Sequence, residues 1–176
     1  MTKSKFNTKQ LVLAALCVAL GVVLPVAFHS IPNAGSVLLP MHIPVLLCGL
    51  VCGPVYGLLS GILTPLLSSM ITGMPPMAYL PGMLCELAAY GLVSGVFWHK
   101  VKHTVPMMYA SLVTAMVAGR LVWGAVRFVL AGLAGSSFPF SAFLSGAVLT
   151  AVPGIVAQLI LIPLIVAALQ KAKLTD

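Results

Sequence analysis

Three charged side chains lie within long apolar runs of this 176-residue chain, namely Glu86, Arg120 and Arg127. A charged group in hydrocarbon costs at least about 2.5–3.5 kcal/mol, and such residues usually mark a functional site. A fourth ionisable side chain, His42, lies near the start of another apolar run. A buried guanidinium without a protein anion favours a carboxylate or a phosphate as its partner. These residue types therefore indicate a site that recognises a small anion.

The three charges cannot all pair with one another, because a single carboxylate meets two guanidinium groups. Arg120 and Arg127 are seven residues apart and therefore share one face of a helix. A rise of about 1.5 Å per residue places Arg127 about 7 Å, Glu86 about 10 Å and Arg120 about 18 Å from the outer ends of their helices. These depths predict a Glu86–Arg127 ion pair and leave Arg120 for a ligand. An alternative interpretation extends Arg127 to the outer lipid headgroups.

Further polar and aromatic residues accompany these charges along the sequence. Trp123 lies one helical turn from Arg127, and several methionines lie in or beside the predicted outer loops. Methionine side chains are polarisable and pack well against flat rings. Gln158, in the last apolar run, is expected to form a hydrogen bond between helices. The predicted binding residues are Arg120, Arg127, Glu86, His42, Trp123, Asn33 and Tyr79.

The sequence lacks the common motifs for catalysis and metal binding. It contains no GxxxxGK[ST], HExxH or GxSxG motif. The chain therefore has no recognisable residues for ATP hydrolysis, zinc proteolysis or acyl transfer. Cys48 and Cys52 are four residues apart, but no CxxC pair supplies further metal ligands. All four cysteines lie in apolar stretches and are expected to pack as small apolar side chains. We therefore expect no enzyme, no metal site and no cofactor.

The composition is typical of an integral membrane protein. Apolar residues make up 61% of the chain and charged residues only 6%, and the mean hydropathy is +1.16. A soluble domain carries roughly 25% charged residues, because these cover its surface. The net charge of +7 comes from lysines and arginines, which in a membrane protein report topology. The charge therefore gives no reason to expect a nucleic-acid partner.

The lysines predict the number and direction of the membrane crossings. They cluster at 3–9, 100–102 and 171–173, and such clusters collect on the cytoplasmic side. An even number of spans must therefore separate each cluster from the next, and spans of about 20 residues allow four and then two. The prediction is an all-α bundle of six transmembrane helices with cytoplasmic N- and C-termini. It forms a single membrane domain, 1–176, with helices at about 10–28, 38–52, 55–72, 80–98, 105–132 and 141–170.

One short sequence occurs twice with a single substitution, as YGLLSG at 56–61 and as YGLVSG at 90–95. The glycines of each copy are four residues apart. Small residues at this spacing let helix backbones approach closely within a membrane. We expect the third and fourth spans to pack together here, and the alternative is that these glycines dock another membrane subunit.

Three segments match the pattern of a known family. Ala15 and Ala19 form an AxxxA element in the first helix, residues 39–61 are LPMHIPVLLCGLVCGPVYGLLSG, and residues 119–124 are GRLVWG. Together with six short helices, these segments resemble the S components of energy-coupling factor (ECF) transporters. Those proteins are the membrane-embedded substrate-binding subunits of vitamin importers in prokaryotes. The resemblance implies that Ala15 and Ala19 dock on the transmembrane T component.

The resemblance also implies a function in the cell membrane of a prokaryote. The chain would capture a vitamin or vitamin precursor from outside, with the loops at 29–36 and 73–80 closing over it. It would then topple in the membrane and release the ligand inside, together with a T component and two ATP-binding subunits. The excess positive charge favours pantothenate, niacin, biotin or lipoate, while riboflavin or a pyridoxine-like compound stays open. The alternatives are a stand-alone proton-coupled secondary transporter that uses Glu86, and a membrane enzyme or assembly factor.

Overall fold

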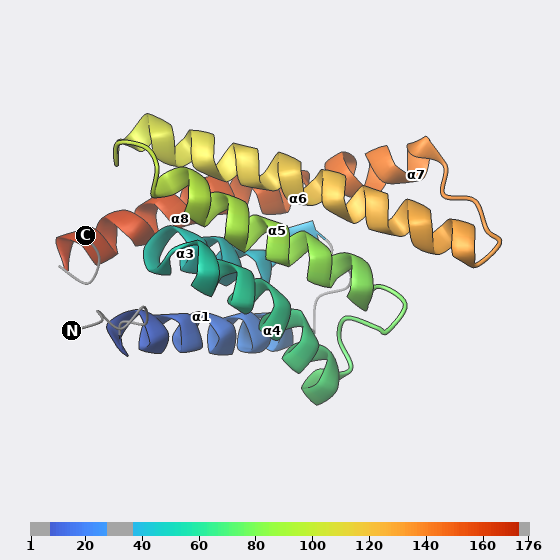
Figure 1. Cartoon of the computed structure of the whole chain (residues 1–176), viewed down its shortest axis with the longest axis horizontal. Coiled ribbons are helices and arrows are strands. Elements are labelled where there is room, and N and C mark those ends of the chain that lie inside the picture. Colours follow the sequence, from blue (N-terminus) through green and yellow to red (C-terminus); the bar gives the residue numbers. More distant parts are fainter. Residues whose placement is uncertain (1–7, 28–36, 173–176) are drawn as a thin grey trace, which may run out of the picture.

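The computed structural model describes residues 8–27 and 37–172, and every regular element among them is a helix. The helices are α1 (Thr8–Ala27), α3 (His42–Cys52), α4 (Pro54–Thr72), α5 (Leu80–Trp98), α6 (Val105–Leu133), α7 (Phe140–Leu144) and α8 (Val152–Lys171). A π-helical segment, Ser145–Leu149, lies between α7 and α8. Over the described residues the chain is therefore an all-α bundle (Figure 1).

Most of these helices have the length and composition of membrane spans. Five of them (α1, α4, α5, α6 and α8) are long and apolar enough to cross a membrane, whereas the apolar helix α3 has only 11 residues. Large apolar side chains, among them Leu11, Val55 and Phe128, are exposed on the surface of the bundle. An apolar surface of this kind suits lipid better than water. The structure thus has the helices and the surface of a multi-pass membrane protein.

The second predicted range, 38–52, contains a shorter helix than expected. Leu39 adopts a left-handed conformation (φ 49°), and α3 begins only at His42. A non-glycine residue in this conformation is not compatible with a continuous α-helix, which explains the later start.

The sixth predicted range, 141–170, is not one continuous helix. The break falls between the π-helical segment and α8, just before Pro153. Pro153 occupies the first turn of α8, where a missing backbone N–H leaves no hydrogen bond unmade. Pro163, in contrast, lies inside α8 without ending it.

Helices α4 and α5 pack with their backbones in contact. A Cβ atom added at Gly57 would overlap the carbonyl oxygen of Gly91, and one added at Gly61 would overlap that of Leu87. Gly49 brings α3 against the same Gly91 carbonyl. The predicted packing of these two helices is therefore confirmed. The alternative is wrong for these glycines, because they are occupied within the chain and do not dock another subunit.

Helix α1 packs on this core through one face only. Ala14, Cys17 and Gly21 are buried, and Gly21 lies against Thr64 of α4. The Cys17 thiol belongs to a buried apolar cluster that also contains Cys48 and Cys52, so these cysteines pack as expected. No group of three or more potential metal ligands occurs among the described residues.

The lysines of the described residues gather at one end of the bundle. The start of α1 with Lys9, the α5–α6 connection and the end of α8 with Lys171 lie together on one side (Figure 1). We call this the lysine end. The opposite end, called the loop end, carries the α4–α5 connection at 73–79 and the α6–α7 connection at 134–139.

Helices α5 and α6 run antiparallel in a fixed register. Near the lysine end, the Ser111 hydroxyl donates a hydrogen bond to the Ser94 carbonyl oxygen (3.0 Å). Toward the loop end, a Cβ added at Gly82 would lie 3.3 Å from the Trp123 ring. This register leaves the last turns of α6 extending beyond the start of α5 at the loop end (Figure 1). That extension decides which residues of the two helices meet.

Candidate substrate-binding site

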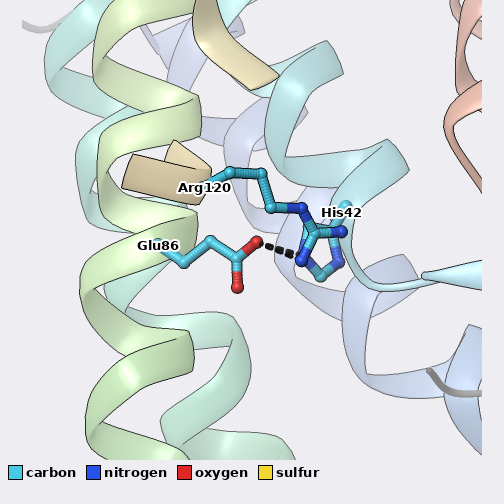
Figure 2. Close-up of polar contacts among 3 residues, drawn as sticks. All are labelled: His42, Glu86 and Arg120. Atoms are coloured by element: carbon cyan, nitrogen blue, oxygen red, sulfur yellow. Dashed lines mark ion pairs between the residues drawn. The ribbon is translucent and has the colours of Figure 1, made fainter. Parts of the chain in front are cut away.

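A buried polar centre joins three helices through His42 of α3, Glu86 of α5 and Arg120 of α6 (Figure 2). Arg120 Nη1 lies 2.9 Å from Glu86 Oε1. His42 Nε2 lies 3.5 Å from the same carboxylate oxygen. The three residues are 78 positions apart at most in the sequence, and only helix packing brings them together. We call these three residues the polar centre.

Two neighbours fix the position of the polar centre. The Tyr90 ring, one turn from Glu86, meets the His42 ring edge to face at a centroid distance of 5.2 Å. Gly119, beside Arg120, has no side chain, so the Tyr90 ring fits directly against the α6 backbone. This contact places Arg120 within reach of Glu86.

The prediction that Glu86 pairs with Arg127 is wrong, because Arg120 holds that carboxylate. That prediction assumed that the outer ends of α5 and α6 lie at the same depth in the membrane. In the structure α6 extends past α5, and the register places Arg127 opposite Ala78, ahead of the first turn of α5. The same offset brings Arg120 to the level of Glu86.

Several buried nitrogen atoms of the polar centre have no hydrogen-bond partner among the described residues. They are Nε and Nη2 of Arg120 and both ring nitrogens of His42. The N–H bonds at Nε and Nη2 of a guanidinium are parallel and form the edge that binds both oxygens of a carboxylate. The Arg120 side chain is 12% exposed, against 4% for Glu86, while its Nε and Nη2 atoms are themselves buried. Arg120 therefore combines an ion pair at one nitrogen with an unused edge suited to an anion.

Gln158 adds a further unpaired polar group. It is 1% exposed on α8, a helix that packs against both α3 and α6. Its amide nitrogen and oxygen have no partner among the described residues, so the expected hydrogen bond between helices is not formed. A buried amide without partners costs about 1–3 kcal/mol, which a bound ligand or water would offset.

Arg127 has a separate environment at the loop end. Its Nη1 donates a hydrogen bond to the Ala78 carbonyl oxygen (3.3 Å). Its guanidinium carbon lies 4.9 Å from the centre of the Tyr79 ring and 5.8 Å from that of Phe138. These contacts connect α6 to the α4–α5 loop and to the α6–α7 loop. Tyr79, predicted as a binding residue, is therefore a direct neighbour of Arg127.

Trp123 lies between the two arginines on α6 and belongs to an aromatic cluster. Its ring centroid is 5.9 Å from that of Phe138 and 6.2 Å from that of Phe143. The glycines Gly82 and Gly146 make room for the indole on two sides. Phe138 and Phe143 were not among the predicted residues. The FPF sequence at 138–140 was the available signal, since aromatic residues in an otherwise small-residue loop need a packing partner.

A cavity of about 400 Å³ opens at the loop end. Its walls come from the α4–α5 loop, the start of α5, the last turns of α6 and the α6–α7 loop. They are formed by Met77, Ala78, Pro81, Arg127, Leu130, Ala131, Ala134, Ser136, Ser137 and Phe138. The cavity thus combines one cation and two serines with several apolar residues.

The structure divides the predicted binding residues into two groups. His42, Glu86 and Arg120 form the polar centre, and Tyr79 and Arg127 meet at the loop end, with Trp123 between the groups. Asn33 and the loop at 29–36 lie outside the described residues. Glu86 is the only acidic side chain among the described residues. One of the two arginines therefore has no acidic partner in this part of the chain.

Comparison with known proteins supports the resemblance seen in the sequence. A model of the substrate-specific component of ECF transporters matches residues 9–166, nearly the whole chain. Neither the curated proteins nor the solved structures contain a match. This family consists of transporter subunits rather than enzymes. The chain therefore belongs to the family of substrate-specific components of ECF transporters.

Proposed function

We propose that this protein captures a small organic anion, a carboxylate- or phosphate-bearing vitamin or vitamin precursor, from outside the cell. It delivers this substrate to the cytoplasm in complex with a T component and two ATP-binding subunits. Membership of the family supports this function over that of a stand-alone proton-coupled carrier that uses Glu86. The protein itself binds the substrate and has no catalytic role.

The proposal of an anionic substrate is supported mainly by the unused edge of the Arg120 guanidinium. Its Nε and Nη2 atoms are buried without a partner, although Nη1 is held by Glu86. The substrate's carboxylate or phosphate accepts hydrogen bonds from this edge. His42 and Gln158 offer further unpaired polar groups, which suit a ligand with a second polar function. Arg127, Trp123 and Tyr79 lie on the loop-end side of this centre.

The proposed orientation places the lysine end in the cytoplasm. Lys9, Lys100, Lys102 and Lys171 all lie at that end, in agreement with the positive-inside rule. The loop end, with the cavity, then faces outward. The chain crosses the plasma membrane of a prokaryote six times, with the short helix α3 as the second crossing and both termini inside.

Docking on the T component is proposed for the free face of α1. Ala15 and Ala19 are exposed, whereas Ala14 and Cys17 face the bundle. Small exposed residues one turn apart let a partner helix approach closely. The structure thus leaves available the face that the AxxxA element requires.

The decisive experiment identifies the ligand. The full chain is purified from cells grown in rich medium, and small molecules released by denaturation are identified by mass spectrometry. We expect an organic anion in a 1:1 ratio to protein, and co-expression with T and ATP-binding subunits should permit its ATP-dependent uptake. A neutral ligand would contradict the anion assignment, and uptake without ATP-binding subunits would contradict the importer.

A further inference from the structure

We propose that His42 takes up one proton when a monoanionic substrate binds at Arg120, so that a carboxylate is captured together with a proton from the outer solution. This inference rests on the proposed function, because it takes Arg120 as the anion-binding residue. It narrows the substrate class to molecules with a single negative charge. It also makes substrate capture depend on pH.

The charge balance of the polar centre gives the first reason. With a neutral His42 imidazole the centre has no net charge, since the Arg120 guanidinium and the Glu86 carboxylate form an ion pair at 2.9 Å. His42 is 1% exposed and Glu86 3%, so both lie away from water. A bound monoanion would leave one unbalanced negative charge in this buried site, which is costly at low dielectric constant. One added proton restores neutrality.

The His42 imidazole is well placed to hold that proton (Figure 2). Its Nε2 lies 3.5 Å from Glu86 Oε1, and neither ring nitrogen has a hydrogen-bond partner among the described residues. A neutral imidazole has one donor and one acceptor, whereas the imidazolium has two donors. The carboxylate oxygen beside it is an acceptor. A protonated His42 therefore matches this neighbour and keeps its second N–H for the substrate or for water.

Two charges act on this proton in opposite directions. The Glu86 carboxylate favours the imidazolium, while the Arg120 guanidinium at the same carboxylate oxygen disfavours it by like-charge repulsion. A bound anion adds a second negative charge and shifts the balance toward the imidazolium. Histidine ordinarily titrates at about pH 6.5, so a change of one charge nearby alters its protonation in the physiological range.

The other titratable groups that face His42 are less suited to take up the proton. Arg120 is protonated already, as arginine is at every physiological pH. Protonation of Glu86 would break the ion pair that holds the guanidinium in position. Tyr90, whose ring contacts that of His42, is a neutral phenol with no proton to gain.

Helices α1, α4 and α8 also pack against α3, but their titratable side chains lie away from His42. Cys17 of α1 and Tyr56 of α4 belong to the apolar cluster around Cys48 and Cys52, at the other end of α3. The remaining ones lie at the lysine end, namely Lys9 of α1 and Lys171 of α8. The described residues thus leave His42 as the proton-binding group.

The proton linkage has a defined direction. The complex holds more protons than the empty protein, so binding strengthens as the pH falls and weakens as it rises. Above the range in which histidine titrates, one linked proton changes the affinity by up to about tenfold per pH unit. Capture is then favoured in a mildly acidic medium, and release is favoured at a neutral pH inside the cell.

Calorimetry of the full chain in phosphatidylcholine nanodiscs measures this proton directly. The probes are pantothenate, biotin and lipoate, which each carry one carboxylate, with panthenol, biotinamide and lipoamide as uncharged counterparts. Titrations at about pH 7 in Bis-Tris and in Tris, which differ in ionisation enthalpy, give the number of protons taken up. We expect at least about half a proton per bound carboxylate, and none for an uncharged counterpart. Carboxylate affinity should fall at least about fivefold from about pH 6 to about pH 8.

Two histidine variants test where the proton binds. His42→Gln keeps a polar side chain that cannot titrate in this range, so proton uptake and the pH dependence of affinity should both disappear. His103→Gln is the matched control, because this exposed histidine stacks on Trp98 at the lysine end. It should retain the uptake. Proton uptake that survives in His42→Gln would overturn the inference.

The wild-type titrations separate this inference from the proposed function. Carboxylate binding with no proton uptake would overturn the inference and leave the anionic substrate in place. If none of the three carboxylates binds at any pH, the anionic substrate is contradicted and the inference falls with it. The comparison of buffers needs no variant, so it decides the inference even if His42→Gln does not fold. Circular dichroism of each variant checks that the helices are intact.

Discussion

Arg120 and Glu86 form a buried ion pair, with Arg120 Nη1 2.9 Å from Glu86 Oε1. The ion pair fixes the guanidinium in the bundle while its Nε–Nη2 edge stays buried and unpaired. The Glu86 carboxylate thus holds Arg120 in position and leaves the Nε–Nη2 edge of the guanidinium free to bind an anion. This relationship makes the role of Arg120 measurable.

Arg120→Ala should bind the copurifying ligand at least about tenfold more weakly, and it should also unfold at a lower temperature, because the buried Glu86 carboxylate loses its guanidinium partner. A charge-assisted contact of this kind contributes about 1.5–3 kcal/mol, or roughly ten- to hundredfold in affinity. Arg120→Lys should also weaken binding, because lysine keeps the charge but lacks the planar edge. Calorimetric titration of the purified proteins checks both values. Unchanged affinity in the alanine variant would show that Arg120 is structural.

Glu86→Gln should lower the thermal stability of the protein, because it leaves the Arg120 guanidinium without its carboxylate. Breaking a buried pair from one side typically costs about 3–5 kcal/mol. The double variant Glu86→Gln/Arg120→Gln should lose less than the sum of the two single variants, since no unpaired charge remains. Thermal unfolding in detergent measures the four proteins. Additive losses would mean that the two side chains do not interact.

Gly91→Ala should destabilise the bundle by about 1–3 kcal/mol or more, since overpacking forces backbones apart. Its Cβ would overlap the carbonyl group of Gly57 on α4. Gly132→Ala is the matched control, because a Cβ there meets nothing within 4 Å. Gly91→Ala should therefore unfold at a clearly lower temperature than Gly132→Ala. Equal temperatures would argue against backbone contact between α4 and α5.

The double variant Ala15→Trp/Ala19→Trp should bind ligand normally but lose uptake. Both residues are exposed on α1, and bulky rings there would block a close partner helix. Leu16→Trp/Leu20→Trp is the control, because these neighbouring exposed residues are already large. Uptake assays with co-expressed T and ATP-binding subunits compare the variants. Normal transport by the alanine double variant would contradict docking through this face.

The sequence by itself determined the features that depend on composition and local pattern. Its apolar content predicted a helical membrane protein, and the family model confirms the resemblance carried by segments such as 39–61. The repeated glycines at 56–61 and 90–95 predicted the contact of α4 with α5, because small-residue spacing alone specifies a close approach. It also identified Glu86, Arg120 and Arg127 as unusual, since charges within apolar runs are visible without a structure.

Only the tertiary structure decided which of these charges meet. The depth of a residue along its own helix says nothing about how far neighbouring helices are offset, and α6 extends beyond α5 at the loop end. This offset pairs Glu86 with Arg120, brings in His42 from α3, and leaves Arg127 to the Ala78 carbonyl and two rings. The offset is set by interlocking side chains and glycines, such as Tyr90 against Gly119, from segments far apart in the chain. Such long-range packing has no local sequence pattern, so the pairing could not be derived before the helices were placed.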